Sequence, residues 1–82
     1  MAYLVYIDRV EETFDFVDYR FKGSGYNIQP GDGMLRINKQ TGEIDVLEHS
    51  GPDWEKLFEM AMMKLAKHWY SHDFPEHTTF AA

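Results

Sequence analysis

The sequence contains no cysteine, so neither a disulfide nor a zinc site with thiolate ligands reinforces the fold, and no cysteine nucleophile is available. It also contains no apolar run that approaches the roughly 20 residues of a membrane-spanning helix. The opening segment, Met-Ala-Tyr-Leu-Val-Tyr-Ile-Asp, lacks the basic region of a secretory signal peptide. These absences favour a cytoplasmic protein that does not associate with a membrane.

Basic residues are scarce: eight lysines and arginines stand against fourteen acidic residues, which gives a net charge of −6. Binding to a nucleic-acid backbone requires a stripe of lysine and arginine, so we expect no such binding. The acidic residues gather between residues 8 and 18 and again between residues 43 and 59. Such clusters either form a solvated surface that keeps the protein soluble or attract a basic protein partner.

A chain of 82 residues is long enough for one domain with two layers and a modest core. We predict a single α+β domain over residues 1–73 and a C-terminal tail over residues 74–82. The tail is expected to be poorly ordered unless Phe74 and Phe80 dock on the core.

The residue pattern from Met34 to Leu47 predicts a β-hairpin. Two alternating segments, Met34–Asn38 and Glu43–Leu47, flank the turn Lys39–Gly42, in which Gly42 supplies the positive φ that such turns need. The predicted register pairs Asn38 with Glu43, Ile37 with Ile44, Leu35 with Val46 and Arg36 with Asp45. One face is then aliphatic and the other charged, and a shift by one residue would expose every aliphatic side chain.

A long amphipathic helix is predicted directly after the hairpin. Either Ser50 or Gly51 can cap it, Pro52 has the fixed φ of a first turn, and Phe74-Pro75 ends it. Its apolar stripe contains Trp54, Leu57, Phe58, Ala61, Leu65, His68 and Trp69. We expect this stripe to cover the aliphatic face of the sheet.

The N-terminal half allows two interpretations. Tyr3–Ile7 is rich in aromatic and β-branched residues and predicts a strand. Residues 9–22 carry apolar side chains at helical spacing, but the absence of Ala, Leu and Met from Thr13–Lys22 favours a strand there. Tyr26–Gln29, between two glycine-containing turns, is typical of a short edge strand.

These elements predict an α+β fold in which an antiparallel sheet of three to four strands, in the order ββ(β)ββα, is covered on one face by the C-terminal helix. The alternative order is βαββα, with residues 9–22 helical.

His68 and His72 are the sharpest candidates for metal chemistry. Four residues apart on a helix, they point the same way and can share one metal ion, with Asp73, Glu76 or His77 completing the ligands. Both also fall on the core-facing side, where a neutral histidine commonly hydrogen-bonds to the backbone. The residues alone leave a metal site and structural histidines both open.

Catalysis finds no support in the residue pattern. No glutamate follows His68 in the zinc-protease arrangement, and none of Ser24, Ser50 and Ser71 lies on a strand-to-helix elbow. We therefore expect a protein that is not an enzyme and that carries no cofactor.

Several exposed positions are suited to contact a partner protein. Methionines beyond the helix stripe adapt to binding surfaces, and Tyr6 and Tyr19 are expected on the second face of the sheet. The predicted partner-binding residues are Asp15, Asp18, Tyr19, Asp45, Glu59, Met60, Met63 and Tyr70. The same sheet face could instead join two copies of the chain in a homodimer.

The segment Gly31–Leu47, followed by a loop with Pro52 and then a helix, resembles small bacterial proteins of the YrhB-like and toxin-immunity kind. It is similar to them in having a glycine-containing turn, a strand, a Thr-Gly-Glu turn and a second strand in that order. The resemblance covers less than half the chain, and the N-terminal helix of that group is not evident. It implies a role in blocking a partner, and it transfers no functional residue.

The leading hypothesis is a small acidic protein that binds a protein partner stoichiometrically, as an immunity protein or inhibitor does, and a mobile-element origin would fit it. The alternatives are a metal- or small-ligand-binding module centred on His68 and His72, and a homodimeric structural domain.

Overall fold

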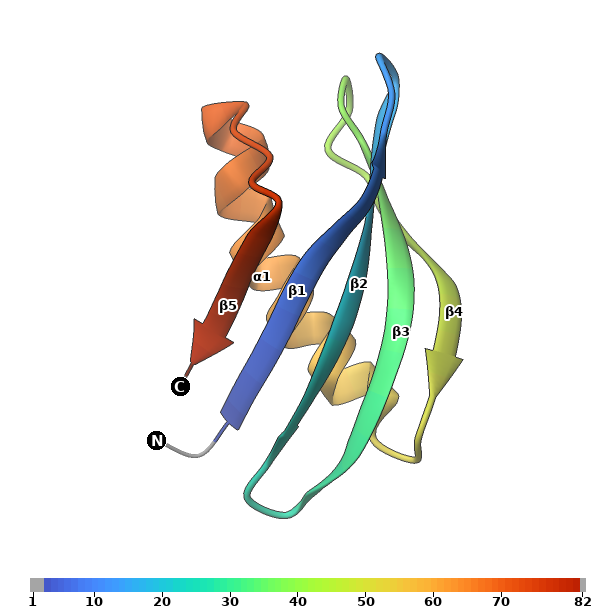
Figure 1. The fold of residues 1–82 in the computed structure, drawn as a ribbon, viewed down its shortest axis with the longest axis vertical. Helices are drawn as coiled ribbons and strands as arrows, with labels where there is room; N and C mark the ends of the chain where they lie inside the picture. Colours follow the sequence, from blue (N-terminus) through green and yellow to red (C-terminus); the bar gives the residue numbers. More distant parts are fainter. Residues whose placement is uncertain (1–2, 82) are drawn as a thin grey trace.

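The computed structural model describes residues 3–81, in which a five-stranded antiparallel sheet carries one helix on one face (Figure 1). The elements in chain order are β1 (Tyr3–Glu12), β2 (Phe16–Gly25), β3 (Ile28–Asn38), β4 (Ile44–Ser50), α1 (Trp54–Ser71) and β5 (His77–Ala81). Residues 1, 2 and 82, the outer ends of the predicted domain and tail, lie outside the described residues. The predicted α+β class, with the helix over one sheet face, is confirmed.

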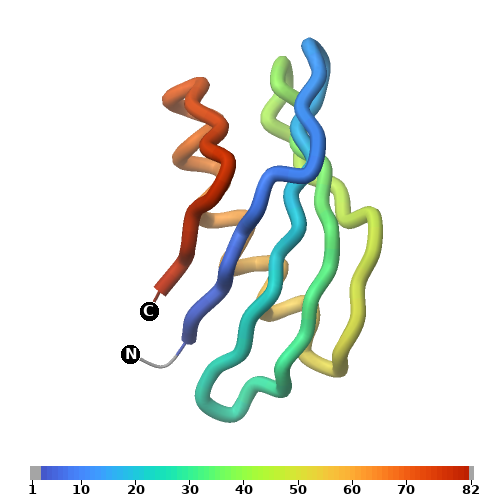
Figure 2. Tube along the Cα trace, viewed as in Figure 1, coloured from blue at the N-terminus to red at the C-terminus, as the bar shows by residue number. Residues whose placement is uncertain are grey.

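The strand order β4-β3-β2-β1-β5 follows from chain connectivity. Strands β1 to β4 form an antiparallel meander in which consecutive strands pair. The chain then leaves β4 at one edge, crosses behind the sheet in α1 and returns as β5 at the opposite edge (Figure 2). One helix of 18 residues therefore spans the sheet diagonally and covers a single face.

The helical alternative for residues 9–22 is wrong. Phe16–Gly25 forms the central strand β2, which pairs with β1 on one side and β3 on the other. Aromatic and β-branched residues fit this pleated, doubly paired position better than a helix. The apolar spacing that suggested a helix arises partly from Val10, an extra residue at a bulge in β1.

The predicted register of the β3–β4 hairpin is confirmed. Ile37 pairs with Ile44, Leu35 with Val46 and Arg36 with Asp45, and the Asn38 amide donates to the Glu43 carbonyl at 2.9 Å. Gly42 has the expected positive φ of 78°. The register then shifts by one residue, so that Met34 lies opposite Glu48 and Leu47 is left over as a bulge.

The predicted edge strand at Tyr26–Gln29 and the turn at Pro30–Gly33 are corrected, because β3 runs without interruption from Ile28 to Asn38. Its glycine at position 33 serves close packing: a Cβ there would lie 2.5 Å from Cζ of Phe21. The chain reverses instead after Gly25, where Asn27 has a left-handed φ of 59°.

Helix α1 begins later than predicted. Asp53, not Ser50 or Gly51, occupies the N-cap position, and its carboxylate accepts a hydrogen bond from the Gln29 amide at 2.7 Å. That contact ties the start of the helix to β3.

Five of the seven residues of the predicted helix stripe pack on the core, whereas Trp54 stacks on His49 and His68 lies beside Thr78. Leu57, Ala61 and Leu65 are fully buried, while Phe58 and Trp69 pack partly against the core. The Trp69 indole donates to the Lys39 carbonyl at 2.8 Å and so joins the helix end to the hairpin turn.

The segment predicted as a C-terminal tail belongs to the domain. Phe74 and Phe80 pack against the core, as we expected for an ordered tail. His77–Ala81 forms β5 and pairs with β1. The domain boundary at residue 73 is therefore corrected, and β5, a strand that was not predicted from the sequence, completes the sheet.

Candidate functional site

The predicted partner-binding residues do not form one surface. Asp18 and Asp45 lie on the face of the sheet opposite α1, in register with Arg36 between them. Glu59, Met63 and Tyr70 are exposed on α1, which covers the other face. Asp15 is exposed in the turn between β1 and β2. Helix and sheet residues therefore cannot meet the same flat partner surface.

Tyr19 is the clearest error among these residues. Its side chain is fully buried on the helix-facing side of β2, and its hydroxyl donates to the Pro75 carbonyl at 2.8 Å. Burial raises the pKa of Tyr19 to about 12. The strict alternation of Val17, Tyr19 and Phe21 with charged residues was the signal that places Tyr19 in the core.

Two further residues are less available than predicted. Met60 is half-buried and packs against the core. Asp18 is only 4% exposed and accepts two hydrogen bonds from Arg36, at 2.8 and 3.0 Å. These bonds raise the pKa of Arg36, whose guanidinium also lies 3.8 Å from the centre of the Phe16 ring. The charge of Asp18 is thus already neutralised by a neighbour.

The histidine pair does not have the geometry that a shared metal requires. Helix α1 ends at Ser71, so His72 lies beyond it with a left-handed φ of 51°, while Nε2 of His68 lies 3.5 Å from Oγ1 of Thr78. Residues 3–81 contain no group of three or more His, Cys, Asp or Glu side chains placed to hold a metal ion. The premise of two histidines on one helix face is wrong.

The sheet face opposite α1, called here the uncovered face, is organised in three rows that cross the strands. The first row contains Asp45, Arg36, Asp18 and Glu11; the second Glu48, Met34, Arg20, Asp8 and His77; the third Ser50, Asp32, Lys22, Tyr6 and Thr79. Six carboxylates thus oppose three lysine and arginine side chains.

Ion pairs compensate only part of this negative charge. Arg20 pairs with Glu48 at 3.3 Å, and Nδ1 of His77 lies 2.7 Å from Asp8. Among residues 3–81, Glu11, Asp32 and Asp45 take part in no ion pair. Two of these three lie in the first row, so the acidic excess is concentrated at the end of the sheet that holds the β1–β2 and β3–β4 turns.

Two shallow depressions, of about 230 and 210 Å³, lie over β2, β3 and β4 at the opposite end of this sheet. Both are lined by Asp32 and Ser50, together with Lys22 in the first and Arg20 in the second. Their open shape leaves these charged groups in contact with water.

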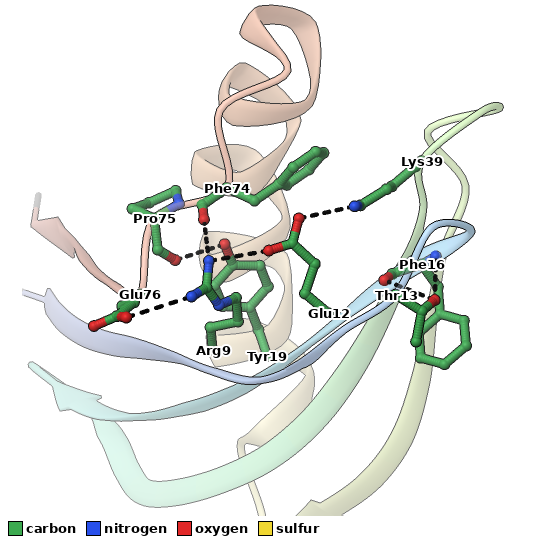
Figure 3. Close-up of polar contacts among 9 residues, drawn as sticks. All are labelled: Arg9, Glu12, Thr13, Phe16, Tyr19, Lys39, Phe74, Pro75 and Glu76. Carbon is green, nitrogen blue, oxygen red and sulfur yellow. Dashed lines mark hydrogen bonds and ion pairs between the residues drawn. The ribbon is translucent and has the colours of Figure 1, made fainter.

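A polar cluster at the first-row end was not foreseen from the sequence (Figure 3). Arg9 donates to the Phe74 carbonyl at 2.8 Å and pairs with Glu12 at 3.1 Å, and Glu12 accepts from Lys39 at 2.8 Å. The hydrogen bond from Lys39 lowers the pKa of Glu12. Every charged group in the cluster is paired, and its contacts fasten the segment that leads into β5.

No helix in residues 3–81 is long and apolar enough to cross a membrane. In comparisons with known proteins, no family model, no curated protein and no solved structure matches this chain.

Proposed function

We propose that this protein acts by stoichiometric binding of a basic protein partner, in the manner of an immunity or inhibitor protein and without catalysis, and that the uncovered face is the contact surface. The observation that carries the proposal is the acidic excess on a sheet face that no other element of residues 3–81 covers. The resemblance of Gly31–Leu47 to YrhB-like and toxin-immunity proteins, and a cytoplasmic location, form part of this proposal.

Charge complementarity supports this assignment. A surface with uncompensated carboxylates raises the association rate with a positively charged partner and disfavours acidic ones. Glu11 and Asp45 stand at the two ends of the first row, outside the Asp18–Arg36 pair. A partner that bridges both ends with lysine or arginine would therefore cover the whole row.

The face also offers apolar area beside its charges. Tyr6 is 53% exposed on β1, and Phe16 is half-buried under Arg36 on β2. Aromatic side chains of this kind supply most of the binding energy in protein interfaces, whereas charges at the rim mainly set rate and specificity.

The test is affinity capture from a lysate of the source cells, with proteins identified by mass spectrometry and stoichiometry measured by native mass spectrometry on the purified pair. The double variant Glu11→Gln, Asp45→Asn removes two charges from the uncovered face. Its matched control, Glu55→Gln, Glu59→Gln, removes two exposed charges from α1.

We expect the first variant to slow association with the partner at low salt and the control to leave it unchanged. Equal association rates for the two variants, or failure of the wild-type protein to retain any partner at low salt, would refute the proposal.

A further inference from the structure

The turn between β1 and β2, called here the tip (Thr13, Phe14 and Asp15), presents an unusually exposed aromatic residue. Phe14 is 86% exposed, the largest value among the exposed large hydrophobic residues of the described chain. Val10, the bulged residue of the same hairpin, is 55% exposed. Neither side chain is part of the core, so neither stabilises the fold by burying apolar surface.

The tip is held rigidly by its own hydrogen bonds. The Thr13 amide donates to the Phe16 carbonyl at 2.8 Å, and Oγ1 of Thr13 accepts from the amides of Asp15 and Phe16 at 3.2 and 3.1 Å (Figure 3 shows the Thr13–Phe16 contacts). The Lys39 amide also donates to the Asp15 carbonyl at 3.0 Å and so joins the tip to the neighbouring turn. A backbone held in this way loses little conformational entropy on binding.

The surroundings of the tip are acidic. Asp15 is exposed and, within residues 3–81, forms no ion pair; Glu11, on the adjoining strand, is in the same state. By contrast, Glu12 is paired with Lys39 and Arg9. The tip therefore joins an apolar protrusion to two free carboxylates at the end of the sheet where the acidic first row lies.

We infer that the tip is the anchor of the interface: Phe14 inserts into an apolar pocket of the partner protein, and lysine or arginine residues at the rim of that pocket pair with Asp15 and Glu11. This inference rests on the proposed function and adds to it the residue that supplies most of the affinity and the shape of the partner's site. A protruding aromatic residue on a hydrogen-bonded turn requires a concave apolar receptor, and the flanking carboxylates select a basic rim.

Tyr26 provides a matched control, because it is 74% exposed in the β2–β3 turn at the other end of the sheet. A photoreactive phenylalanine analogue is placed at position 14 or at position 26 of the full chain, and cross-links are formed in a lysate of the source cells. The cross-linked protein is identified, purified and titrated with the wild-type protein, Phe14→Ala and Tyr26→Ala by calorimetry.

The expected result is a cross-link from position 14 and not from position 26. Phe14→Ala should weaken binding by roughly 30-fold or more, while Tyr26→Ala changes it by less than about threefold. Binding of the wild-type protein should weaken as salt is raised, and mapping of the cross-link should place it beside lysine or arginine in the partner.

Two outcomes would overturn the inference and are distinguishable from each other. If the purified partner binds the wild-type protein and Phe14→Ala equally, or cross-links from position 26 instead, Phe14 is not the anchor. The proposed function would still stand. If position 14 cross-links only to a second copy of the chain, or if no partner is found, both the anchor role of Phe14 and the proposed function are refuted. Cross-linking keeps the aromatic ring in place, so its result does not depend on how well Phe14→Ala folds.

Discussion

Removing the Tyr19 hydroxyl tests the contact that fastens the C-terminal segment to the sheet. In Tyr19→Phe the ring still fills the core, but the Pro75 carbonyl loses the donor that lies 2.8 Å away. A lost hydrogen bond that leaves a poorly solvated acceptor costs about 1–2 kcal/mol. For a domain of this size that corresponds to a decrease in Tm of roughly 5–15 °C.

The stability difference between the wild-type protein and Tyr19→Phe depends on pH. The pKa of Tyr19 rises from 10.0 to about 12 on folding, because burial disfavours the phenolate. Below pH 10 the hydroxyl is protonated in both states and its stabilisation is complete. As pH rises from 10 to 12, the unfolded state loses this proton first, so the wild-type protein loses stability that Tyr19→Phe never had.

Urea denaturation at a series of pH values measures both effects, with the exposed Tyr26→Phe as control. We expect the difference between wild-type and Tyr19→Phe to be constant from pH 7 to about 10 and to shrink above it. A variant as stable as the wild-type protein at neutral pH, or a stability difference that does not shrink above pH 10, would refute the argument.

Two further pairs of substitutions test the core and the uncovered face. Leu57→Ala removes a fully buried side chain and should lower the free energy of unfolding by about 2–5 kcal/mol, whereas Leu47→Ala, 41% exposed, should cost less than about 1 kcal/mol; tryptophan fluorescence in urea compares them. Arg36→Ala leaves the buried Asp18 carboxylate without its two hydrogen bonds and should lower Tm more than Arg20→Ala, whose partner carboxylate is exposed. Equal shifts in thermal unfolding for the two arginine variants would contradict that ranking.

The sequence was informative where a pattern and its consequence lie close together in the chain. The β3–β4 register follows from alternating residues on either side of one turn, and the buried stripe of α1 follows from helical spacing. The alternating pattern does not predict the register beyond Leu35, because Leu47 forms a bulge and Met34 therefore lies opposite Glu48. A bulge depends on how the strand bends beside its neighbours, which adjacent residue types do not specify.

Strand β5 was missed because its structure depends on distant residues. His77–Ala81 is only five residues long, and it becomes a strand by pairing with β1, more than sixty positions earlier in the chain. Thr78, Thr79 and Phe80 have the residue types of a strand, which was a usable local signal. The Arg9 contacts that hold the preceding segment join groups equally far apart and have no signature in the sequence.

At the candidate site too, the sequence predicts features that depend on neighbouring residues but not those that depend on residues far apart in the chain. Acidic composition was visible at once, but whether a carboxylate is free depends on its cross-strand neighbour. Asp18 and Asp45 both lie beside Arg36 in the register, yet within residues 3–81 Arg36 bonds only to Asp18, so the charge of Asp18 is paired and that of Asp45 is not. Counting charges along the sequence cannot show which of the two carboxylates is paired.

Under the proposed function, the uncovered face would meet the partner with the charges of Asp18, Glu48 and Asp8 already paired and with its remaining negative charge at one end. The exposed aromatic tip lies at that same end. Long-range attraction and short-range apolar contact would then act on the same region, so electrostatic steering would bring the proposed partner to the place where burial of Phe14 would slow its release. Salt should therefore reduce mainly the association rate, whereas removal of the ring should raise mainly the dissociation rate.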